Sequence, residues 1–190
     1  MLKILRSTKQ DLITSLCVRF ALPLTVPEYT GSPQLLQSVG KAKTWQVDTS
    51  TVFLHPEYLH PPSQFNSYKF EFAAVNPKYQ GRKYTTAYGI GFGDGVLVGQ
   101  SIVKLDLENK QFTRKWQDDI CYTSEPIFVP RPGSNDEDDG VIITTCLSPE
   151  KNKPWSSLVV LNTDLNEVGR LTFNNVLSPA SFHGAWIQGQ

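Results

Sequence analysis

Two hydrophobic periodicities divide the chain. Over residues 1–16, apolar side chains recur at the spacing of an amphipathic helix, at Leu2, Leu5, Leu12, Ile13 and Leu16. We predict a short N-terminal helix there, whose apolar side packs on the rest of the protein; contact with a membrane surface is the alternative. From residue 18 the period changes to two, which predicts β-structure over residues 18–190.

Short runs rich in Val, Ile, Thr and aromatic residues follow one another between clusters of Gly, Pro, Asn and Asp. The predicted strands are Val18–Leu22, Trp45–Leu54, Lys83–Gly89, Val96–Leu107, Phe112–Trp116, Glu125–Val129, Val141–Leu147, Ser157–Leu161 and Val168–Phe173. No helical pattern alternates with these runs, so the chain is predicted to be an all-β sandwich, barrel or propeller.

The last third of the chain has the clearest organisation. Its four successive strands are joined by a turn at Asp136–Gly140, a loop at Pro149–Trp155 and a turn at Thr163–Asn166. We predict one antiparallel meander of the kind that makes a propeller blade. The acidic turn lacks the alternating ligands of an EF-hand, so a solvated hairpin turn is expected there.

Composition excludes several classes of protein. Lys+Arg and Asp+Glu are equal at 18 each, so no overall charge favours nucleic acid. The three cysteines, Cys17, Cys121 and Cys146, form neither a CxxC pair nor a disulfide framework, which fits a reducing cytosol. No apolar run approaches the roughly 20 residues of a membrane-spanning helix. A cytoplasmic protein is therefore predicted.

The run Gly89–Gly95 places glycine at every second position. This spacing differs from the G-x-G-x-x-G of a dinucleotide-binding loop, and strand-like sequence stands on both sides of it. A turn with close backbone approach is predicted instead.

The histidines are His55, His60 and His183. His55 and His60 lie among prolines, five positions apart, and are predicted to occupy the surface or a loop. His183 lies between Phe182 and Gly184, where composition alone favours a hydrogen-bonded core histidine over a metal ligand. A catalytic metal needs several protein ligands, so one histidine cannot form such a site.

Two glutamates are embedded in apolar, strand-like sequence. Glu71 lies between Phe70 and Phe72, and Glu125 precedes Pro126. Each carboxylate is either exposed on the solvent face of a strand or buried with a partner, and from the residues alone exposure is expected.

Several ordered segments resemble the metazoan carotenoid oxygenase family, which includes beta-carotene cleavage enzymes and a retinoid isomerohydrolase. The resemblance extends from about Val18 onward. It rests on Arg19–Leu24, Phe70–Phe72, Asn76, Gly81–Tyr84, Tyr88-Gly89, Ser124–Gly133, Glu137–Ile142, Leu158–Leu161, Glu167–Arg170 and Phe182–Gly184. Departures from the family pattern include Thr123 and Ala73, where Pro is usual, and Trp186, where Phe is common.

The resemblance implies a seven-bladed β-propeller with Fe(II) on its axis, held by four histidines from different blades. His183 matches the last of these ligands. Glu125 and Glu71 match glutamates that hydrogen-bond ligand imidazoles, which orients a histidine and raises its basicity. Glu125 is assigned as the partner of His183, and Glu71 would support a histidine that this chain does not contain.

The resemblance therefore implies that residues 1–190 are the C-terminal blades of a longer enzyme, with the upstream blades missing. The implied activity is oxidative cleavage of a conjugated double bond in a carotenoid or apocarotenoid by O2, with peripheral membrane contact through the missing regions. A retinoid isomerohydrolase is the alternative within the family. A non-catalytic propeller fragment that acts as an interaction module is the alternative from another class.

Overall fold

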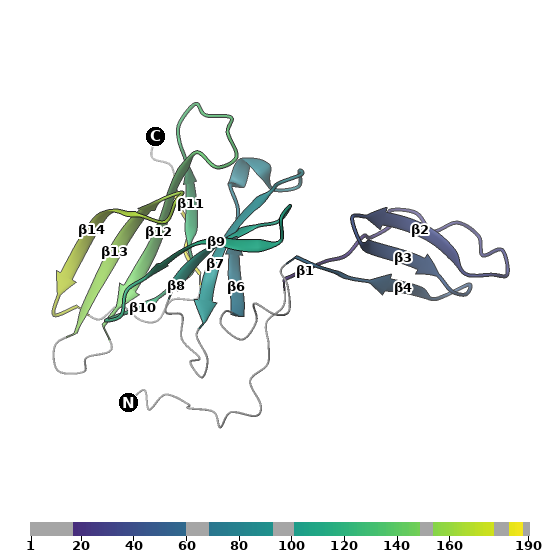
Figure 1. Ribbon diagram of the computed structural model, residues 1–190, viewed down its shortest axis with the longest axis horizontal. Helices are drawn as coiled ribbons and strands as arrows, with labels where there is room; N and C mark the ends of the chain where they lie inside the picture. The colour runs from purple at the N-terminus through teal and green to yellow at the C-terminus, as the bar shows by residue number, and fades with distance from the viewer. Residues whose placement is uncertain (1–16, 60–68, 93–100, 149–153, 177–182, 188–190) are drawn as a thin grey trace, which may run out of the picture. The chain divides into compact units, whose positions relative to one another are not determined.

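The computed structural model describes residues 17–59, 69–92, 101–148, 154–176 and 183–187 (Figure 1). These residues form β-sheets with one short 3-10 turn, η2 (Pro77–Tyr79), which confirms the predicted all-β class. The helix predicted over residues 1–16 lies outside the described residues. Within the described residues no helix has the length and hydropathy to cross a bilayer. The chain divides into two compact units, residues 16–59 and residues 60–190 with 1–15.

The smaller unit contains two antiparallel sheets. Strands β2 (Gln34–Val39), β3 (Ala42–Gln46) and β4 (Val52–His55) form a three-stranded meander, and β1 (Val18–Arg19) pairs with β5 (Glu57–Tyr58). Alternate residues of β3 are buried, at Ala42, Thr44 and Gln46, as expected for a central strand with one covered face. Strand β2 was not predicted from the sequence.

The single strand predicted over Trp45–Leu54 is wrong, because a turn divides it into β3 and β4. The Asp48 carboxylate accepts a hydrogen bond of 2.8 Å from the Ser50 backbone N–H, and the Val47 N–H donates to the Thr51 carbonyl at 3.1 Å. Such Asx turns let a short polar side chain replace backbone partners, and they reverse the chain within an otherwise strand-like run.

The strand predicted over Val18–Leu22 is shorter than expected and ends at Arg19. The carbonyl of Ala21 accepts a hydrogen bond from the buried Thr44 hydroxyl, so this backbone is satisfied by a side chain. The Arg19 Nε donates to the buried Glu57 carboxylate at 3.0 Å, so the buried negative charge of Glu57 has a positively charged partner.

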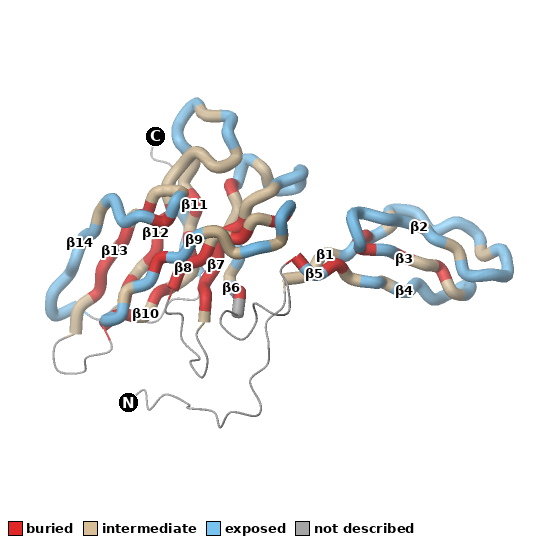
Figure 2. Tube along the Cα trace, viewed as in Figure 1, coloured by how far each residue is buried: buried red, intermediate tan, exposed pale blue. Residues whose placement is uncertain are grey.

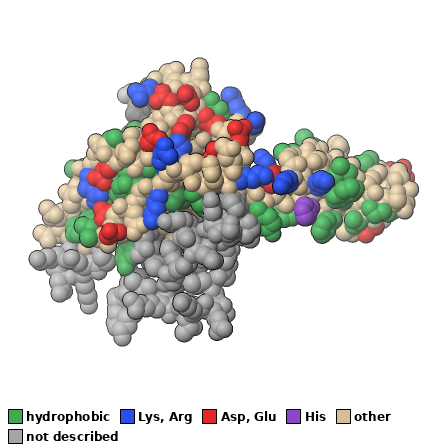
Figure 3. Space-filling model, in the orientation of Figure 1, with side chains coloured by type: hydrophobic (Ala, Val, Ile, Leu, Met, Phe, Trp, Pro, Cys, Tyr) green, Lys and Arg blue, Asp and Glu red, His purple; other side chains and the backbone are tan. Residues whose placement is uncertain are grey.

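The surface of the smaller unit is rich in apolar side chains. Figure 3 shows hydrophobic side chains between Lys and Arg side chains on its visible face. The large exposed hydrophobic residues of this unit are Phe20, Leu22, Leu24, Val26, Leu35, Val39, Val52, Phe53 and Tyr58.

The first sheet of the larger unit is an antiparallel meander. It consists of β6 (Lys69–Ala74), β7 (Thr86–Phe92), β8 (Ser101–Asp106) and β9 (Gln111–Gln117), in that order. Of the predicted glycine run, Gly89 and Gly91 lie in β7, so the predicted turn is wrong for this part. The close backbone approach is confirmed, because a Cβ on Gly89 would lie 2.8 Å from the Glu71 carbonyl.

The second sheet contains β10 (Tyr122–Thr123), β11 (Ile127–Pro130), β12 (Gly140–Leu147), β13 (Trp155–Asn162) and β14 (Glu167–Asn174). Strands β11 to β14 pair in sequence order, which confirms the predicted meander. The short strand β10 pairs with the far end of β12 and was not predicted. Burial alternates along β12 and β13, as the period of two indicates.

One hydrophobic core joins these two sheets, and buried segments run through β7, β8, β12 and β13 (Figure 2). Both sheets contribute large buried side chains, including Tyr88, Ile102, Phe128, Ile142 and Leu161. Burying such side chains contributes about 1.5–3 kcal/mol each.

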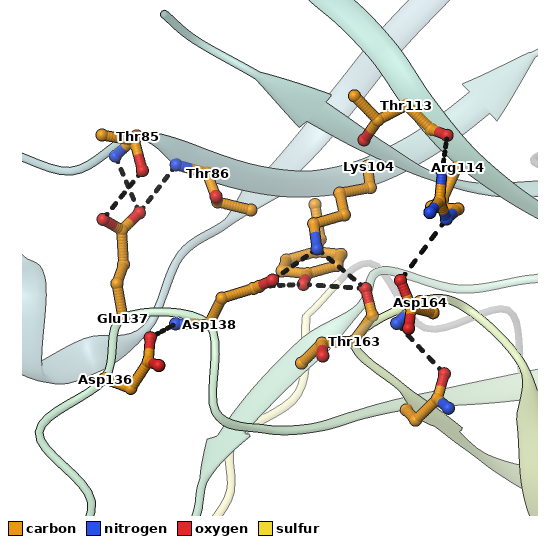
Figure 4. A network of polar contacts seen from close by, with 12 residues as sticks. Thr85, Thr86, Lys104, Thr113, Arg114, Asp136, Glu137, Asp138, Thr163 and Asp164 are labelled. Carbon is orange, nitrogen blue, oxygen red and sulfur yellow. Dashed lines mark hydrogen bonds and ion pairs between the residues drawn. The ribbon is translucent and has the colours of Figure 1, made fainter.

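The acidic turn between β11 and β12 is not merely solvated, as predicted from the sequence, but is bonded to the first sheet (Figure 4). One Glu137 oxygen accepts hydrogen bonds from the backbone N–H groups of Thr85 and Thr86, each at 2.7 Å. The other accepts from the Thr85 hydroxyl at 3.0 Å. Asn76 donates to the Glu137 carbonyl at 3.0 Å. These bonds hold the turn against the start of β7.

Asp138 makes the second set of contacts from this turn. Its carboxylate accepts from the Tyr88 hydroxyl and pairs with Lys104 Nζ, which also donates to the Thr163 carbonyl at 3.0 Å (Figure 4). Burial and the hydrogen bond to Asp138 raise the pKa of Tyr88 well above its usual range. The turn therefore fixes the start of the second sheet relative to the first.

Candidate metal centre

Glu125 lies between β10 and β11, in a segment held by side chains of β12. The Thr144 hydroxyl donates to the Ser124 carbonyl at 2.9 Å, and the Ser124 N–H donates to the Thr145 carbonyl at 3.0 Å. The Ser124 hydroxyl also lies 2.7 Å from the Thr145 hydroxyl. Pro126 follows at once and restricts Glu125 to an extended backbone. The Glu125 side chain thus extends from a backbone that is fixed on both sides.

The structure brings Glu125 and His183 together. His183 Nδ1 lies 3.1 Å from Glu125 Oε2, and the Gly184 backbone N–H donates to Glu125 Oε1. Both oxygens of one carboxylate therefore bind adjacent residues of the His183 segment. A Cβ on Gly184 would lie 2.9 Å from Ile127 Cδ1, so glycine lets this segment lie close to β11.

Phe72 contacts the histidine ring from the other sheet. The two ring centroids lie 5.9 Å apart at an interplanar angle of 63°, an edge-to-face arrangement. Phe72 has a φ of 52°, in the left-handed region, where the register of β6 against β7 shifts between Glu71 and Ala74. Such a conformation costs about 1–2 kcal/mol for a residue with a Cβ. It is maintained at the point where Phe72 contacts His183.

The structure also places the other residues singled out from the sequence. Glu71 is exposed on β6, next to Phe72, whose ring contacts that of His183. His55 is exposed at the end of β4, as predicted for a surface residue. His60 lies outside the described residues. The site roles of Phe72 and Gly184 were missed, although both stand inside motifs that carried the family resemblance.

The described residues do not enclose His183 as a core histidine, since its side chain is 80% exposed among them, while that of Glu125 is 17% exposed. An ionised carboxylate only accepts hydrogen bonds, so the Nδ1 of a neutral His183 donates its proton to Glu125. The Nε2 atom then carries the ring's lone pair, which is the form of imidazole that binds metals. His183 and Glu125 therefore fit one ligand of a metal and its supporting carboxylate.

Sequence comparison identifies the family to which this geometry belongs. The family described as retinal pigment epithelial membrane protein matches residues 5–188. The chain belongs to the carotenoid oxygenase family. It is 37% identical over 175 residues to the mitochondrial carotenoid-cleaving dioxygenase of Homo sapiens, covering 89% of this chain and 29% of that protein. For the enzyme of the same name from Mustela putorius furo, identity is 36% over 174 residues, with 89% and 31% coverage.

Solved structures of a family member match the fold. A point mutant of the Synechocystis apocarotenoid oxygenase gives a TM-score of 0.61 at 28% sequence identity, covering 78% of this chain and 30% of that one. A cobalt-substituted form of the same enzyme matches equally well, with a TM-score of 0.61 at 28% identity and the same coverage. This carotenoid oxygenase family member thus spans about 30% of the length of the relatives that it matches.

Proposed function

We propose that this chain is part of a non-haem iron oxygenase that cleaves a conjugated double bond of a carotenoid or apocarotenoid with O2. The observation that carries the proposal is the hydrogen bond from His183 Nδ1 to the half-buried Glu125 carboxylate, in a chain similar to carotenoid-cleaving dioxygenases. A carboxylate on the distal nitrogen is the usual support of a histidine that binds a metal.

The proposed metal is Fe(II), and His183 Nε2 would hold it. When bound by neutral imidazoles, Fe(II) keeps open positions and supplies the redox chemistry that O2 requires. The cobalt-substituted relative shows that a metal can be exchanged in that enzyme. In the proposed arrangement the described sheets belong to a seven-bladed propeller, and Glu71 supports a ligand outside this chain.

The chain's own residues position this one ligand. Glu125 accepts the Nδ1 proton and fixes the tautomer of His183, and its second oxygen binds the Gly184 N–H. Phe72 packs edge-on against the ring and restricts its rotation. The imidazole is therefore oriented before a metal binds, which reduces the entropy lost on coordination.

A chimera tests the proposal most directly. This chain replaces the matching segment of the human carotenoid-cleaving dioxygenase, and the product is compared with its His183→Ala and His55→Ala variants. Iron content is measured by elemental analysis, and products from a carotenoid are separated by chromatography. We expect His183→Ala to abolish iron retention and cleavage, whereas His55→Ala keeps both. Full iron and activity in His183→Ala would refute the ligand assignment.

The second candidate is a retinoid isomerohydrolase, the alternative within the family that the sequence resemblance leaves open. It breaks an ester without consuming O2, so the same chimera is also given all-trans-retinyl ester. Retinol formed without any aldehyde would overturn the oxygenase proposal. Since one histidine cannot retain a catalytic metal, the 190-residue chain assayed alone is expected to be inactive, and an interaction role is the remaining alternative.

The names of the relatives bear on the cellular location. Those proteins are named as mitochondrial, whereas cytoplasmic location was predicted from the sequence. Cys17, Cys121 and Cys146 are not in disulfides, which fits the predicted reducing compartment. Contact with a membrane, from which the insoluble substrate would be drawn, stays a prediction for regions outside this chain.

A further inference from the structure

A cluster of two thiols and one carboxylate lies beside β10 and the end of β12, separate from the His183 site. Asp118, Cys121 and Cys146 each offer one ligand atom, and these atoms all lie within 4.8 Å of one another. Both cysteines are buried, and Asp118 is half-buried. This cluster was not predicted, because Cys121 and Cys146 are far apart in the sequence.

Strand pairing explains why the two thiols meet. In the antiparallel register of β10 and β12, Thr123 lies opposite Cys146. Cys121 directly precedes β10, so the pairing of β10 with β12 brings the segment that carries it to the Cys146 end of β12. The two sulfur atoms lie within 4.8 Å of each other.

Two hydrogen bonds hold the Asp118 carboxylate in place. Its Oδ1 accepts from the Ile120 backbone N–H at 3.0 Å, and its Oδ2 accepts from Arg170 Nη2 of β14 at 2.8 Å. Arg170 is itself held by Glu167, with an Nε–Oε1 distance of 2.8 Å. Each carboxylate oxygen has a second lone pair, so Asp118 can bind a cation without losing these bonds.

The hydroxyl of Thr123 adds an independent observation. Among the described residues, Thr123 Oγ1 is a buried side-chain oxygen with no hydrogen-bond partner. Thr123 is 6% exposed and lies opposite Cys146, on the same face of the sheet. A buried hydroxyl without a partner costs about 1–3 kcal/mol, so a ligand at this face would relieve that cost.

We propose that Asp118, Cys121 and Cys146 form a binding site for a zinc ion, with a water as fourth ligand that hydrogen-bonds Thr123. Tetrahedral zinc with bonds of about 2.0–2.3 Å places its ligand atoms about 3.3–3.8 Å apart, within the spacing of this cluster. Two thiolates neutralise the ion, and Arg170 offsets part of the charge of Asp118 while it also pairs with Glu167. The ion would tie the β9–β10 turn to β12.

A disulfide between the same cysteines is the competing chemistry. Both thiols are buried, so a dissolved oxidant has little access to them. The carboxylate of Asp118 has no role in a disulfide, but it supplies the third ligand atom of a zinc site. Its presence beside the two thiols favours the metal.

Metal titration of the purified 190-residue chain tests the site. Zinc is added in competition with a chromophoric chelator, and cobalt is added separately as a spectroscopic probe. We expect about one ion per chain and a thiolate-to-cobalt charge-transfer band. The band should disappear in Cys121→Ser and Cys146→Ser. Asp118→Asn should keep the band and weaken zinc binding at least about tenfold.

Matched controls separate the site from other thiols and carboxylates. Cys17→Ser and Asp119→Asn remove the same groups outside the cluster and should leave zinc binding unchanged, as should His183→Ala. If the cysteine variants fail to fold, Asp118→Asn still tests the site, since this side chain lies at the edge of the core.

Three outcomes would overturn the proposal. The first is the absence of a cobalt band, with both thiols reacting only after unfolding, which would show a buried thiol pair. A mass lower by two hydrogens would show a disulfide, and binding unaffected in every cluster variant would place the ion elsewhere. Either result would also overturn it.

Discussion

Glu125 and His183 stand 58 residues apart in the sequence and meet in a hydrogen bond of 3.1 Å between Oε2 and Nδ1. The same carboxylate binds the N–H of Gly184, so one side chain holds two consecutive residues. This arrangement fixes both the position and the tautomer of an imidazole whose ring is mostly exposed. A fixed position and a defined tautomer are what an imidazole needs in order to bind a metal.

Glu125→Gln tests this support in the chimera. The amide keeps the size of the side chain but loses the charge, so it holds the His183 Nδ1 proton less strongly. We expect iron affinity and cleavage rate to fall about 10–100-fold while the fold is kept. Iron retained during dialysis against a chelator measures the affinity, and far-ultraviolet circular dichroism measures the fold.

Glu28→Gln provides the matched control, since Glu28 is an exposed carboxylate of the smaller unit. Its iron content should equal that of the parent chimera. Equal iron content in Glu125→Gln and Glu28→Gln would show that Glu125 does not support a ligand.

Gly89→Ala is expected to destabilise the larger unit. An added Cβ would lie 2.5 Å from the Phe70 ring and 2.8 Å from the Glu71 carbonyl, and a backbone carbonyl cannot move aside at low cost. Overpacking of this kind costs about 1–3 kcal/mol. Urea denaturation should therefore show a lower midpoint with an unchanged slope.

Gly169→Ala, also within a strand, serves as the comparison. There the nearest atom to an added Cβ is Val160 Cβ at 4.0 Å, an ordinary contact. Alanine loses less conformational entropy on folding, so Gly169→Ala should be neutral or slightly stabilising. If both substitutions destabilise equally, the close approach of β6 and β7 is not what requires glycine at position 89.

The sequence pattern predicted the second sheet well and the smaller unit poorly. Strands β12 and β13 alternate buried and partly buried residues between polar turns, so their period of two is visible directly. In the smaller unit, β3 and β4 read as one run, because the Asp48 turn contains Thr and Ser rather than Gly or Pro. Just after the early end of β1, the Ala21 carbonyl accepts a hydrogen bond from the Thr44 hydroxyl. A contact of this kind leaves no periodic pattern in the sequence.

The site was predicted in part, and only through family resemblance. Composition favoured a buried His183, and the pairing with Glu125 depends on a contact between distant segments. The contribution of Phe72 depends on a left-handed backbone and a register shift, neither of which a Phe-Glu-Phe run indicates. The cysteine cluster is similar, because strand register rather than sequence spacing brings Cys121 and Cys146 together.

Acid is expected to weaken the β8–β9 hairpin through Asp106. Its carboxylate accepts backbone N–H bonds from Asn109 and Glu108, each at 2.9 Å. The hydrogen bond from Asn109 holds the pKa of Asp106 below its usual value of 3.8. A lowered pKa in the folded state stabilises the protein above the unfolded-state pKa, and this stabilisation is lost as the pH falls through the lower value.

Asp106→Asn removes this titration, so its stability should depend less on pH below about pH 4 than that of the parent chain. Urea midpoints at about pH 6 and about pH 3 measure the difference. If the urea midpoint falls equally in the two proteins between these pH values, Asp106 does not contribute to acid unfolding.

Glu137→Gln should loosen the acidic turn from the first sheet. The carboxylate accepts three hydrogen bonds, from the N–H groups of Thr85 and Thr86 and from the Thr85 hydroxyl. The amide oxygen can still accept from both N–H groups, but these bonds lose the charge of the carboxylate, and the NH2 group replaces the oxygen that accepted from the Thr85 hydroxyl. The expected loss of stability is about 2 kcal/mol, measured by urea denaturation.

Glu108→Gln is the control, because Glu108 and its partner Lys83 are exposed and 3.4 Å apart. This substitution should cost less than about 0.5 kcal/mol of stability. Hydrogen exchange should also accelerate at Thr85 and Thr86 in Glu137→Gln alone. Unchanged exchange at these two amides would mean that the turn is held by Asn76 and Asp138 without Glu137.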